Sequence, residues 1–318
     1  MITKILIITN KSDVTSDFIV KKLRESKIDY YRLNTEDLYS TVSFTFNFDT
    51  DYYYLYDANK HSKYNLWDFT AVYFRRPLLP TFMDSSLSDG DRDFLEREAY
   101  YTLKGLYKIL DNKFWISKPN DIQNAENKFY QLQLAKKLGF LIPSSLATNI
   151  PSDFRKFTNG HKCIIKAVHS SRILGKSSQK IAFTSELTGS PTDEEIKCST
   201  AYLQKEISKK YDVRVTVVGN KVFAAAINSQ MLPDTKVDWR RGEHILKHNR
   251  ITLPPDIESK CLKLLTELNL QYGAIDFVVD KADNYYFLEI NPNGQWAWIE
   301  KQTGYDISGA IVEALCYE

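Results

Sequence analysis

The chain has 318 residues and a mass of 36.9 kDa, and its 42 Lys and Arg residues nearly balance its 40 Asp and Glu residues. This length predicts two or three subdomains, and the balanced charge, without a block of like charges, gives no indication of a nucleic-acid-binding tail. The four cysteines lie far apart without a CxxC pair, which argues against a zinc site, a redox motif or a disulfide framework and favours a reducing cytoplasm.

The chain opens with a pattern typical of a small α/β domain. The apolar run at 5–8 in MITKILIITN is too short for a signal peptide or a membrane span and predicts a buried strand. A helical segment and a second strand, YYRLN at 30–34, follow without the GxGxxG fingerprint of dinucleotide binding. Aromatic residues alternate over 43–57, and AVYFRRP at 71–77 predicts another strand. We expect this domain to end near residue 115.

Helical patterns and two strands follow in the middle of the chain. Apolar residues recur at helical spacing over 89–110 and again over 120–140, where Gly139 is a candidate helix end. The segments KCIIKAV at 162–168 and AYLQKEI at 201–207 are predicted strands. The polar stretch HSSRILGKSSQ between them is a candidate mobile lid.

The last third of the chain predicts two hairpins separated by a helix near 256–268. The first hairpin, YDVRVTVVGNKVFAAAI, has Gly-Asn at the position of a tight turn, and GAIDFVVDKADNYYFLEINPN forms the second. If Asp280 pairs with Tyr285 in the second hairpin, Asp276 lies directly opposite Glu289, with Cβ atoms about 5 Å apart. Two like charges this close destabilise a sheet unless a positive group lies between them.

Asn291 is predicted to join these carboxylates, because side chains two residues apart on a strand point to the same face. The resulting all-oxygen set of Asp276, Glu289 and Asn291 suits Mg²⁺, which takes its remaining ligands from water and substrate phosphates. The alternative is that Asp276 or Glu289 pairs with a lysine or arginine, the commoner fate of a buried carboxylate. The sequence NPNG is also consistent with a simple turn.

Cationic residues near these carboxylates are candidates for polyphosphate contacts. Lys166 lies within the apolar strand CIIKAV, where it either meets an anion or extends its ammonium to solvent. Lys128 lies early in an amphipathic helix, where a solvated surface position is equally consistent with the pattern. Arg214 in YDVRVTVV and Arg240 in VDWRRGEH can be surface charges, although the planar fork of arginine suits a phosphate or an acyl phosphate.

The order of these residues resembles the ATP-grasp fold. Lys128 precedes Lys166, the strand LQKEI and Asp212 with Arg214 follow, and LEINPNGQW comes near the end. Within this superfamily, the stretches KKYDVRVTVVG, KVDWR, AIDFVV, FLEINPNGQWAWIE and YFRRP are similar to the graspetide synthetases, the peptide ligases of the microviridin type. The resemblance covers nearly the whole chain.

This resemblance implies an α/β (α+β) architecture in three parts. We expect a Rossmann-like pre-ATP-grasp domain over 1–115, a central ATP-grasp subdomain with a mobile lid over 116–207, and a C-terminal ATP-grasp subdomain over 208–318. Two features depart from the usual pattern of the superfamily. The lid holds a single glycine, Gly175, where many such lids are glycine-rich, and Lys205 replaces an acid often found in the hinge.

The resemblance also implies a role for each candidate residue. The cations would contact the phosphates of ATP and the acyl phosphate, the backbone of the hinge strand would hold adenine, and Asp212 would lie near the ribose. The implied set is Lys128, Lys166, Gln204, Lys205, Glu206, Ile207 and Asp212 for ATP; Asp276, Glu289 and Asn291 for Mg²⁺; Arg214 and Arg240 for catalysis; and Arg75 for the acidic peptide.

The implied reaction is the ATP-dependent macrocyclisation of a ribosomally made precursor peptide with a leader and an acidic core. A Glu or Asp side chain of the peptide attacks the γ-phosphate of ATP. A Ser or Thr hydroxyl or a Lys amine of the same peptide then attacks the acyl phosphate and closes an ester or amide ring. Such chemistry depends on positioning and charge neutralisation, so the enzyme needs no nucleophilic side chain.

Several alternatives to this interpretation stay open. The chain could be an ATP-grasp ligase that adds free amino acids to a peptide or protein, or a nucleotide- or peptide-binding scaffold without turnover. The acidic stretch SPTDEEIK at 190–197 either binds the leader or is a solvated acidic turn or helix start. The resemblance is consistent with a homodimer, and we expect no nucleic-acid or membrane partner.

Overall fold

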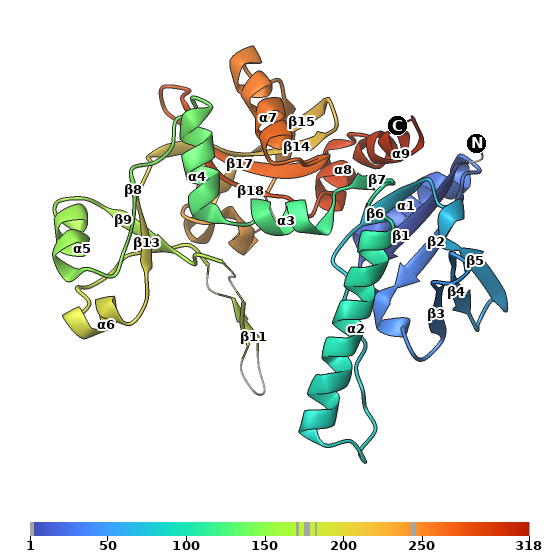
Figure 1. The fold of residues 1–318 in the computed structure, drawn as a ribbon. Coiled ribbons are helices and arrows are strands. Elements are labelled where there is room, and N and C mark those ends of the chain that lie inside the picture. The colour runs from blue at the N-terminus through green and yellow to red at the C-terminus, as the bar shows by residue number, and fades with distance from the viewer. Residues whose placement is uncertain (1–2, 170–171, 175–178, 182, 243–245, 318) are drawn as a thin grey trace.

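The computed structural model describes residues 3–169, 172–174, 179–181, 183–242 and 246–317. Figure 1 shows the N-terminal part, coloured blue to blue-green, on one side of the molecule and the small sheet that carries α5 (Pro151–Thr158) and α6 (Asp193–Lys197) on the other. A larger sheet from the last third of the chain lies between them. The C-terminal helix α9 (Ile307–Tyr317) returns to the N-terminal part and packs beside α1 (Val14–Glu25).

The N-terminal part is built on a parallel sheet with the order β2–β1–β6–β7. Alternate residues of β1 explain why both faces are covered: Ile5 and Ile7 contact the core under α1 and α9, whereas Leu6 and Ile8 join the larger core. The strands are β1 (Lys4–Thr9), β2 (Asp29–Asn34), β6 (Ala71–Phe74) and β7 (Phe114–Ile116), with the short helices η1 (Thr35–Asp37) and η2 (Leu66–Asp68).

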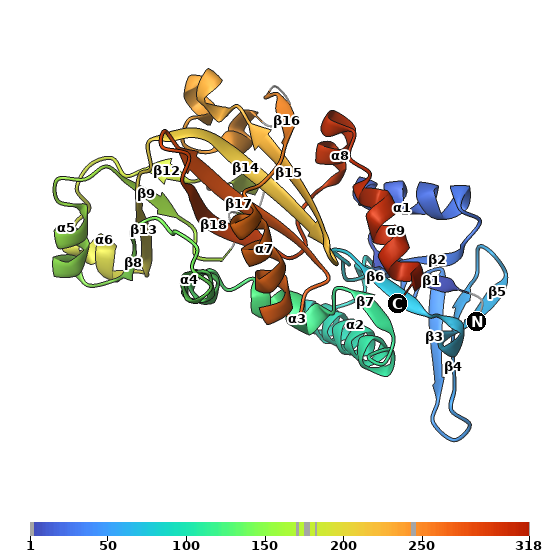
Figure 2. The same ribbon diagram turned by 90° about the horizontal axis from the view of Figure 1, so that it is seen from above.

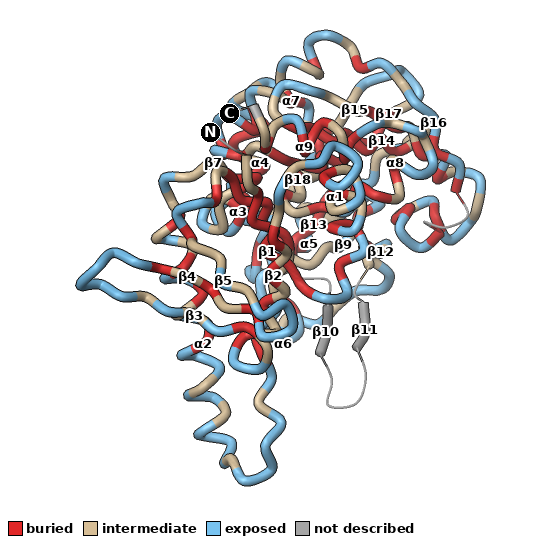
Figure 3. Tube along the Cα trace, turned by 90° about the vertical axis from the view of Figure 1, so that its right-hand side faces the viewer, coloured by how far each residue is buried: buried red, intermediate tan, exposed pale blue. Residues whose placement is uncertain are grey.

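An antiparallel meander and a long helix extend from this sheet. The alternating aromatic segment 43–57 forms the strands β3 (Val42–Asn47) and β4 (Tyr52–Asp57), and β5 (Ser62–Asn65) pairs with β4. Helix α2 (Asp89–Ile109) is predicted correctly, and Ser88 begins it with a capping box that includes Asp91. Figure 3 shows that buried residues gather in the sheets, whereas much of the outer half of α2 is exposed.

The helical pattern over 120–140 forms two helices where one was expected. Helix α3 (Pro119–Ala125) ends before Asn127, whose side chain accepts hydrogen bonds from the N–H groups of Phe129 and Tyr130, each at 3.1 Å, and so begins α4 (Lys128–Lys137). Asparagine competes with helical hydrogen bonding inside a helix but favours its first position. Gly139, at φ +79°, follows α4 as predicted.

This cap gives a stability prediction. We expect Asn127→Ala to lower the free energy of unfolding by about 1 kcal/mol, because two N–H groups in the first turn of α4 lose their acceptor. Urea denaturation followed by circular dichroism measures the change. Asn124→Ala is the control, since Asn124 is exposed in α3; an equal loss in both variants would contradict the capping role.

The central part contains a small antiparallel sheet with the order β12–β9–β13–β8. Phe154 of α5, Ile196 of α6 and Leu203 of β13 form its core. The elements are β8 (Ser145–Thr148), α5 (Pro151–Thr158), β9 (Cys163–Lys166), β12 (Ser185–Glu186), α6 (Asp193–Lys197) and β13 (Ala201–Lys205). The acidic stretch 190–197 contains the start of α6, where Thr192 and Glu195 form a capping box.

The predicted lid coincides in part with a hairpin of β10 (Arg172–Leu174) and β11 (Gln179–Ile181). Residues 170–171, 175–178 and 182 lie outside the described residues, and Gly175 is among them. The mobility of this segment stays a prediction.

The last third forms an antiparallel sheet with the order β16–β15–β14–β17–β18, and Figure 2 shows α7 lying across it. The predicted tight turn at Gly219-Asn220 is confirmed, because Val218 pairs with Lys221 and Gly219 has φ +55°. The elements are β14 (Lys209–Val218), β15 (Lys221–Ile227), η3 (Ser229–Met231), η4 (Pro233–Thr235), η5 (Trp239–Gly242), β16 (His248–Ile251), α7 (Pro255–Glu267), β17 (Tyr272–Asp280), β18 (Tyr285–Asn291) and α8 (Ala297–Thr303).

The register of β17 with β18 differs from the prediction beside the turn. Val279, not Asp280, pairs with Tyr285. Asp280 instead closes the turn: its N–H donates to the carbonyl oxygen of Asn284 at 3.1 Å, and its Oδ1 accepts from the N–H of Asn284 at 2.9 Å. Asp280 therefore stabilises the turn, whereas the strand pattern predicted that it pairs with Tyr285.

A β-bulge then restores the predicted pairing of the two carboxylates. Phe277 pairs with Phe287, the register shifts, and Asp276 pairs with Glu289. Without the extra residue, Asp276 would pair with Leu288, and Glu289 would point to the opposite face of the sheet. The bulge thus places Asp276 and Glu289 on one face.

Candidate active site

A cavity of about 770 Å³ lies where the N-terminal sheet, the small central sheet and the large sheet meet. Asn10, Asp13 and Arg76 line it from the N-terminal part, and Lys128 and Gln131 line it from α4. The predicted residues that line the cavity are Lys128, Lys166, Gln204, Lys205, Glu206, Ile207, Asp212, Arg240, Asp276, Glu289 and Asn291. The two other predicted residues, Arg75 and Arg214, do not line it.

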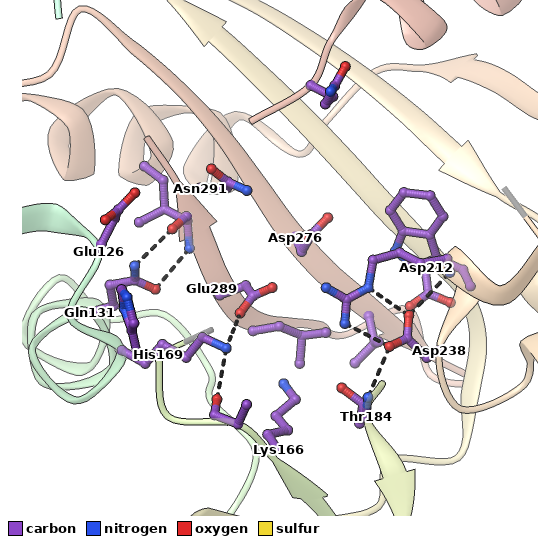
Figure 4. A pocket seen from close by; sticks show the side chains of 18 of the residues that line it. Glu126, Gln131, Lys166, His169, Thr184, Asp212, Asp238, Asp276, Glu289 and Asn291 are labelled. Carbon is purple, nitrogen blue, oxygen red and sulfur yellow. Dashed lines mark hydrogen bonds and ion pairs between the residues drawn. The ribbon is translucent and has the colours of Figure 1, made fainter. Parts of the chain in front are cut away.

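Glu289 lies at the centre of the positive charge in this cavity. The Lys128 ammonium is 3.2 Å from its Oε2 and also donates to the carbonyl oxygen of Ala167 at 3.0 Å (Figure 4). Burial alone would raise the pKa of Glu289, but Lys128, Lys166 and Arg240 outweigh it and lower the pKa to about 2. Glu289 is therefore an anion at any physiological pH.

Asp276, the carboxylate opposite Glu289, has a different environment. Its Oδ1 is 3.3 Å from Nε of Arg214 and makes no hydrogen bond with the described residues, so the contact is an ion pair without hydrogen-bond geometry. Burial, together with the charge of Glu289, raises the pKa of Asp276 to about 6 despite the opposing charge of Arg214. The alternative raised from sequence, a carboxylate paired with a lysine or arginine, thus occurs at both positions.

The Arg214 guanidinium packs against two tryptophan rings. Its guanidinium carbon lies 5.4 Å from the centre of the Trp239 ring and 6.0 Å from that of Trp298, and these two rings are 5.2 Å apart. Such contacts are attractive because the ring faces are electron-rich. Arg214 therefore acts on the cavity through Asp276.

Lys166 extends from the end of β9 toward the carboxylates in Figure 4. Burial lowers the pKa of its ammonium, and the charge of Glu289 opposes this effect. An ammonium in this environment gains stability when a further anion enters the cavity.

Asp238, which sequence reasoning missed, orients Arg240. Nε of Arg240 donates to Oδ1 of Asp238 at 2.8 Å and Nη2 donates to Oδ2 at 2.6 Å, so the pair is bidentate. Oδ2 also accepts from the N–H of Thr184 at 3.1 Å, which connects the residue before β12 to the residue before η5. An acid two residues before an arginine, as in DWR, was the available sequence signal.

The predicted hinge and Asp212 are already engaged in hydrogen bonds. The N–H groups of Lys205 and Glu206 donate to the carbonyl oxygens of Ser144 at 2.8 Å and Lys162 at 2.9 Å. Asp212 accepts from the Lys209 ammonium, 2.7 Å from its Oδ2, and from the Ser229 hydroxyl. Contacts of this segment with adenine and ribose stay predictions.

The location predicted for Arg75 is wrong. Its guanidinium is buried, with 1% of the residue exposed, and Nε lies 3.1 Å from Oδ2 of Asp13. Nη1 donates to the carbonyl oxygen of Gly294 at 3.0 Å, so Arg75 joins the N-terminal part to the turn after Asn291. Strand β6 is buried throughout, and Arg75 directly after it is buried as well; the next residue, Arg76, is half-buried and lines the cavity instead.

The donor set fits a hard divalent cation. Asp276, Glu289 and Asn291 offer oxygen atoms from one face of two paired strands, and Oδ1 of Asp276 is buried without a hydrogen-bond donor among the described residues. Within the described part of the chain, no three His, Cys, Asp or Glu side chains form a metal-binding group. The candidate set of Asp276, Glu289 and Asn291 consists of two carboxylates and an amide. Such a partial set suits Mg²⁺, which shares its coordination with water and phosphate.

A family comparison agrees with this geometry. Residues 125–315 match the model of the RimK-like ATP-grasp domain. The chain belongs to the RimK-like ATP-grasp family. Residues 4–123 of this ATP-grasp chain match the MvdD pre-ATP grasp domain. The ribosomal protein bS6–L-glutamate ligase of Salmonella newport is 26% identical over 198 residues, which are 60% of this chain and 64% of that protein, less than two thirds of its length.

Solved structures resemble this ATP-grasp chain over nearly its full length. The RiPP-associated ATP-grasp ligase of Chryseobacterium gregarium, in complex with ADP and a leader and core peptide, has a TM-score of 0.88 and 28% identity, covering 98% of this chain and 96% of that chain. The macrocyclase MdnC of Microcystis aeruginosa, bound with precursor peptide MdnA, has a TM-score of 0.85 and 26% identity, covering 98% and 99%. The predicted fold class and family are confirmed.

Proposed function

We propose that this chain is an ATP- and Mg²⁺-dependent peptide macrocyclase. It would activate Glu or Asp side chains of a ribosomally made precursor as acyl phosphates and join them to Ser or Thr hydroxyls or Lys amines. The observation that carries the proposal is the pairing of Asp276 with Glu289 in a cavity lined by Lys128, Lys166 and Arg240. The full-length likeness to a peptide-bound ATP-grasp ligase and to a macrocyclase supports it.

The cations and the candidate metal ligands of the cavity would neutralise the phosphate charge of ATP. Lys128 and Lys166 bind the phosphates, and Lys128 exchanges its contact with Glu289 for a phosphate oxygen. Asp276, Glu289 and Asn291 would hold Mg²⁺, which neutralises phosphate charge when bound. Arg240, fixed by Asp238, stabilises the transferred phosphoryl group, since a preorganised donor needs no reorientation during the reaction.

The reaction proceeds in two substitutions. A carboxylate oxygen of the peptide attacks the γ-phosphorus, the bond to the bridging oxygen breaks, and ADP leaves. A hydroxyl or amine of the same peptide then attacks the acyl carbon, and phosphate leaves. Because the second attack closes a ring within one molecule, the peptide loses the elements of one water per bond.

We assign the peptide-facing role to Arg76 instead of Arg75. Arg76 has φ +48°, uncommon for a residue other than glycine, and its Nε donates to the carbonyl oxygen of Asn293 at 3.3 Å. The side-chain amide of Asn10 donates to the Arg76 carbonyl oxygen at 2.7 Å and stabilises this backbone. The guanidinium thus lies at the N-terminal side of the cavity, where an acidic peptide would enter.

Arg76→Gln gives a prediction about the substrate. We expect the KM for the peptide to rise about 10-fold, as for loss of one charge-assisted contact, with little change in the KM for ATP. Steady-state kinetics with each substrate varied in turn measures both constants. Arg97→Gln, an exposed arginine of α2, is the control; equal increases in both KM values would argue against a role in peptide binding.

An amino-acid ligase is the second candidate, because the Salmonella newport relative is named as a ligase of ribosomal protein bS6 and L-glutamate. Peptide-dependent ADP release separates the candidates. A macrocyclase responds to a peptide with both acidic and hydroxyl or amine side chains and needs no free amino acid. If ADP release requires an added amino acid, the macrocyclase proposal fails. If no ADP is released with either addition, the chain is a binding scaffold.

The proposal also includes the cellular location of the protein, the binding of the leader and the formation of a homodimer. All four cysteines are free, which supports a reducing compartment such as the cytoplasm. Within the described residues, every helix is too short or too polar to cross a membrane. Leader binding near α6 and a homodimer stay predictions.

A further inference from the structure

A side chain from α4 completes the hydrogen bonding of β18 between two candidate metal ligands. β18 lies at the end of the large sheet, and its Ile290 is positioned between Glu289 and Asn291. Oε1 of Gln131 accepts from the N–H of Ile290 at 3.0 Å, and Nε2 donates to the carbonyl oxygen of Ile290 at 2.8 Å. The amide therefore binds Ile290 as a neighbouring strand would.

The Gln131 amide is fixed on its other side as well. Its Nε2 donates to the carbonyl oxygen of Ala125 at 2.6 Å, at the end of α3, and 2% of the residue is exposed. Gln131 lies one helical turn after Lys128, so the helix that presents Lys128 to Glu289 is the one that holds Ile290. Helix α4 and β18 are thus joined by the ion pair of Lys128 with Glu289 and by two hydrogen bonds between the Gln131 side chain and the Ile290 backbone.

The β-bulge explains why this strand needs such a contact. Regular pairing with β17 is interrupted between Phe287 and Glu289, which weakens the constraint on the backbone where the ligands begin. Before the bulge, the N–H of Phe287 donates to the carbonyl oxygen of Leu141 at 2.8 Å. After the bulge, Gln131 supplies the corresponding contact at Ile290.

We propose that Gln131 is a positioning residue for the magnesium–nucleotide site. Backbone hydrogen bonds of a strand lie in the plane of the sheet, and side chains stand perpendicular to it. Fixing the Ile290 peptide groups therefore fixes the directions of Glu289 and Asn291, while Ile290 itself is buried in the core. The inference rests on the proposed function only in taking Mg²⁺ with an adenine nucleotide as the ligand.

Gln131→Met tests this role, because methionine has a similar size and cannot make the hydrogen bonds. Groups that orient metal ligands typically change metal affinity by 10-fold or more, so we expect the Kd for ADP with Mg²⁺ to rise about 10-fold. Calorimetry on the full chain, without peptide, measures this Kd. In steady-state assays the KM for ATP should rise, while kcat at saturating ATP falls by less than about 3-fold.

Gln133→Met, on the exposed side of α4, is the matched control and should leave the Kd unchanged. If Gln131→Met does not fold, Gln131→Glu decides by the same criterion, since it retains an acceptor for the Ile290 N–H and loses the donor. An unchanged Kd in the folded variant overturns the proposal, even if thermal stability falls. Because no peptide is present, this outcome is independent of whether the chain forms rings.

Discussion

Glu289→Gln is expected to reduce peptide-dependent ADP release by about 100-fold or more, the usual cost of removing a preorganised electrostatic group. Glu289 is the anion that Lys128, Lys166 and Arg240 surround, and its low pKa shows that these charges favour an ionised ligand. A neutral amide of the same shape keeps the packing but loses the charge needed to hold Mg²⁺ among those cations. Coupled detection of ADP, with and without peptide, measures the effect.

Glu267→Gln is the control for this variant, because Glu267 is exposed at the end of α7. Circular dichroism should show that both variants fold. Turnover in Glu289→Gln equal to that of the control would remove Glu289 from the site.

Lys166→Met is expected to weaken ATP binding by about 10- to 100-fold, as for loss of a hydrogen bond to a charged group. The same change should leave the free energy of unfolding equal or higher, because burial disfavours the Lys166 ammonium in the absence of a ligand. Calorimetry with ATP and Mg²⁺ and urea denaturation measure the two effects separately.

Lys162→Met, in the exposed position before β9, is the matched control for Lys166→Met. A parallel loss of stability and ATP affinity in Lys166→Met would indicate a packing role. Unchanged ATP affinity would exclude Lys166 from phosphate binding.

Most of the fold followed from local patterns in the sequence. Apolar alternation in β1 and the Gly219-Asn220 turn are short-range signals, so their predictions are confirmed. The prediction of one continuous helix over 120–140 was wrong, because Asn127 lies between α3 and α4 and caps the start of α4. The exact pairing beside the turn of β17 and β18 was also wrong, because a side-chain contact of Asp280 replaced a strand position.

The candidate site was less accessible to sequence reasoning where it depends on tertiary contacts. Glu289 and Asp276 were found because both lie on paired strands, although a bulge that no residue pattern indicated was needed to align them. The choice between Arg75 and Arg76 depends on where the buried segment that follows β6 ends, and the local sequence specifies such boundaries poorly. Gln131 gave no signal, because a buried glutamine in an amphipathic helix is recognised only once its partner strand is known.

The most direct test of the proposed function is the mass of the peptide product. The chain is incubated with ATP, Mg²⁺ and a short candidate precursor peptide that carries Glu or Asp together with Thr, Ser or Lys. The proposed function predicts products lighter than the precursor by whole numbers of water, absent without ATP and absent with Glu289→Gln. A product heavier by an amino-acid residue, or an unchanged peptide despite ADP release, would contradict it.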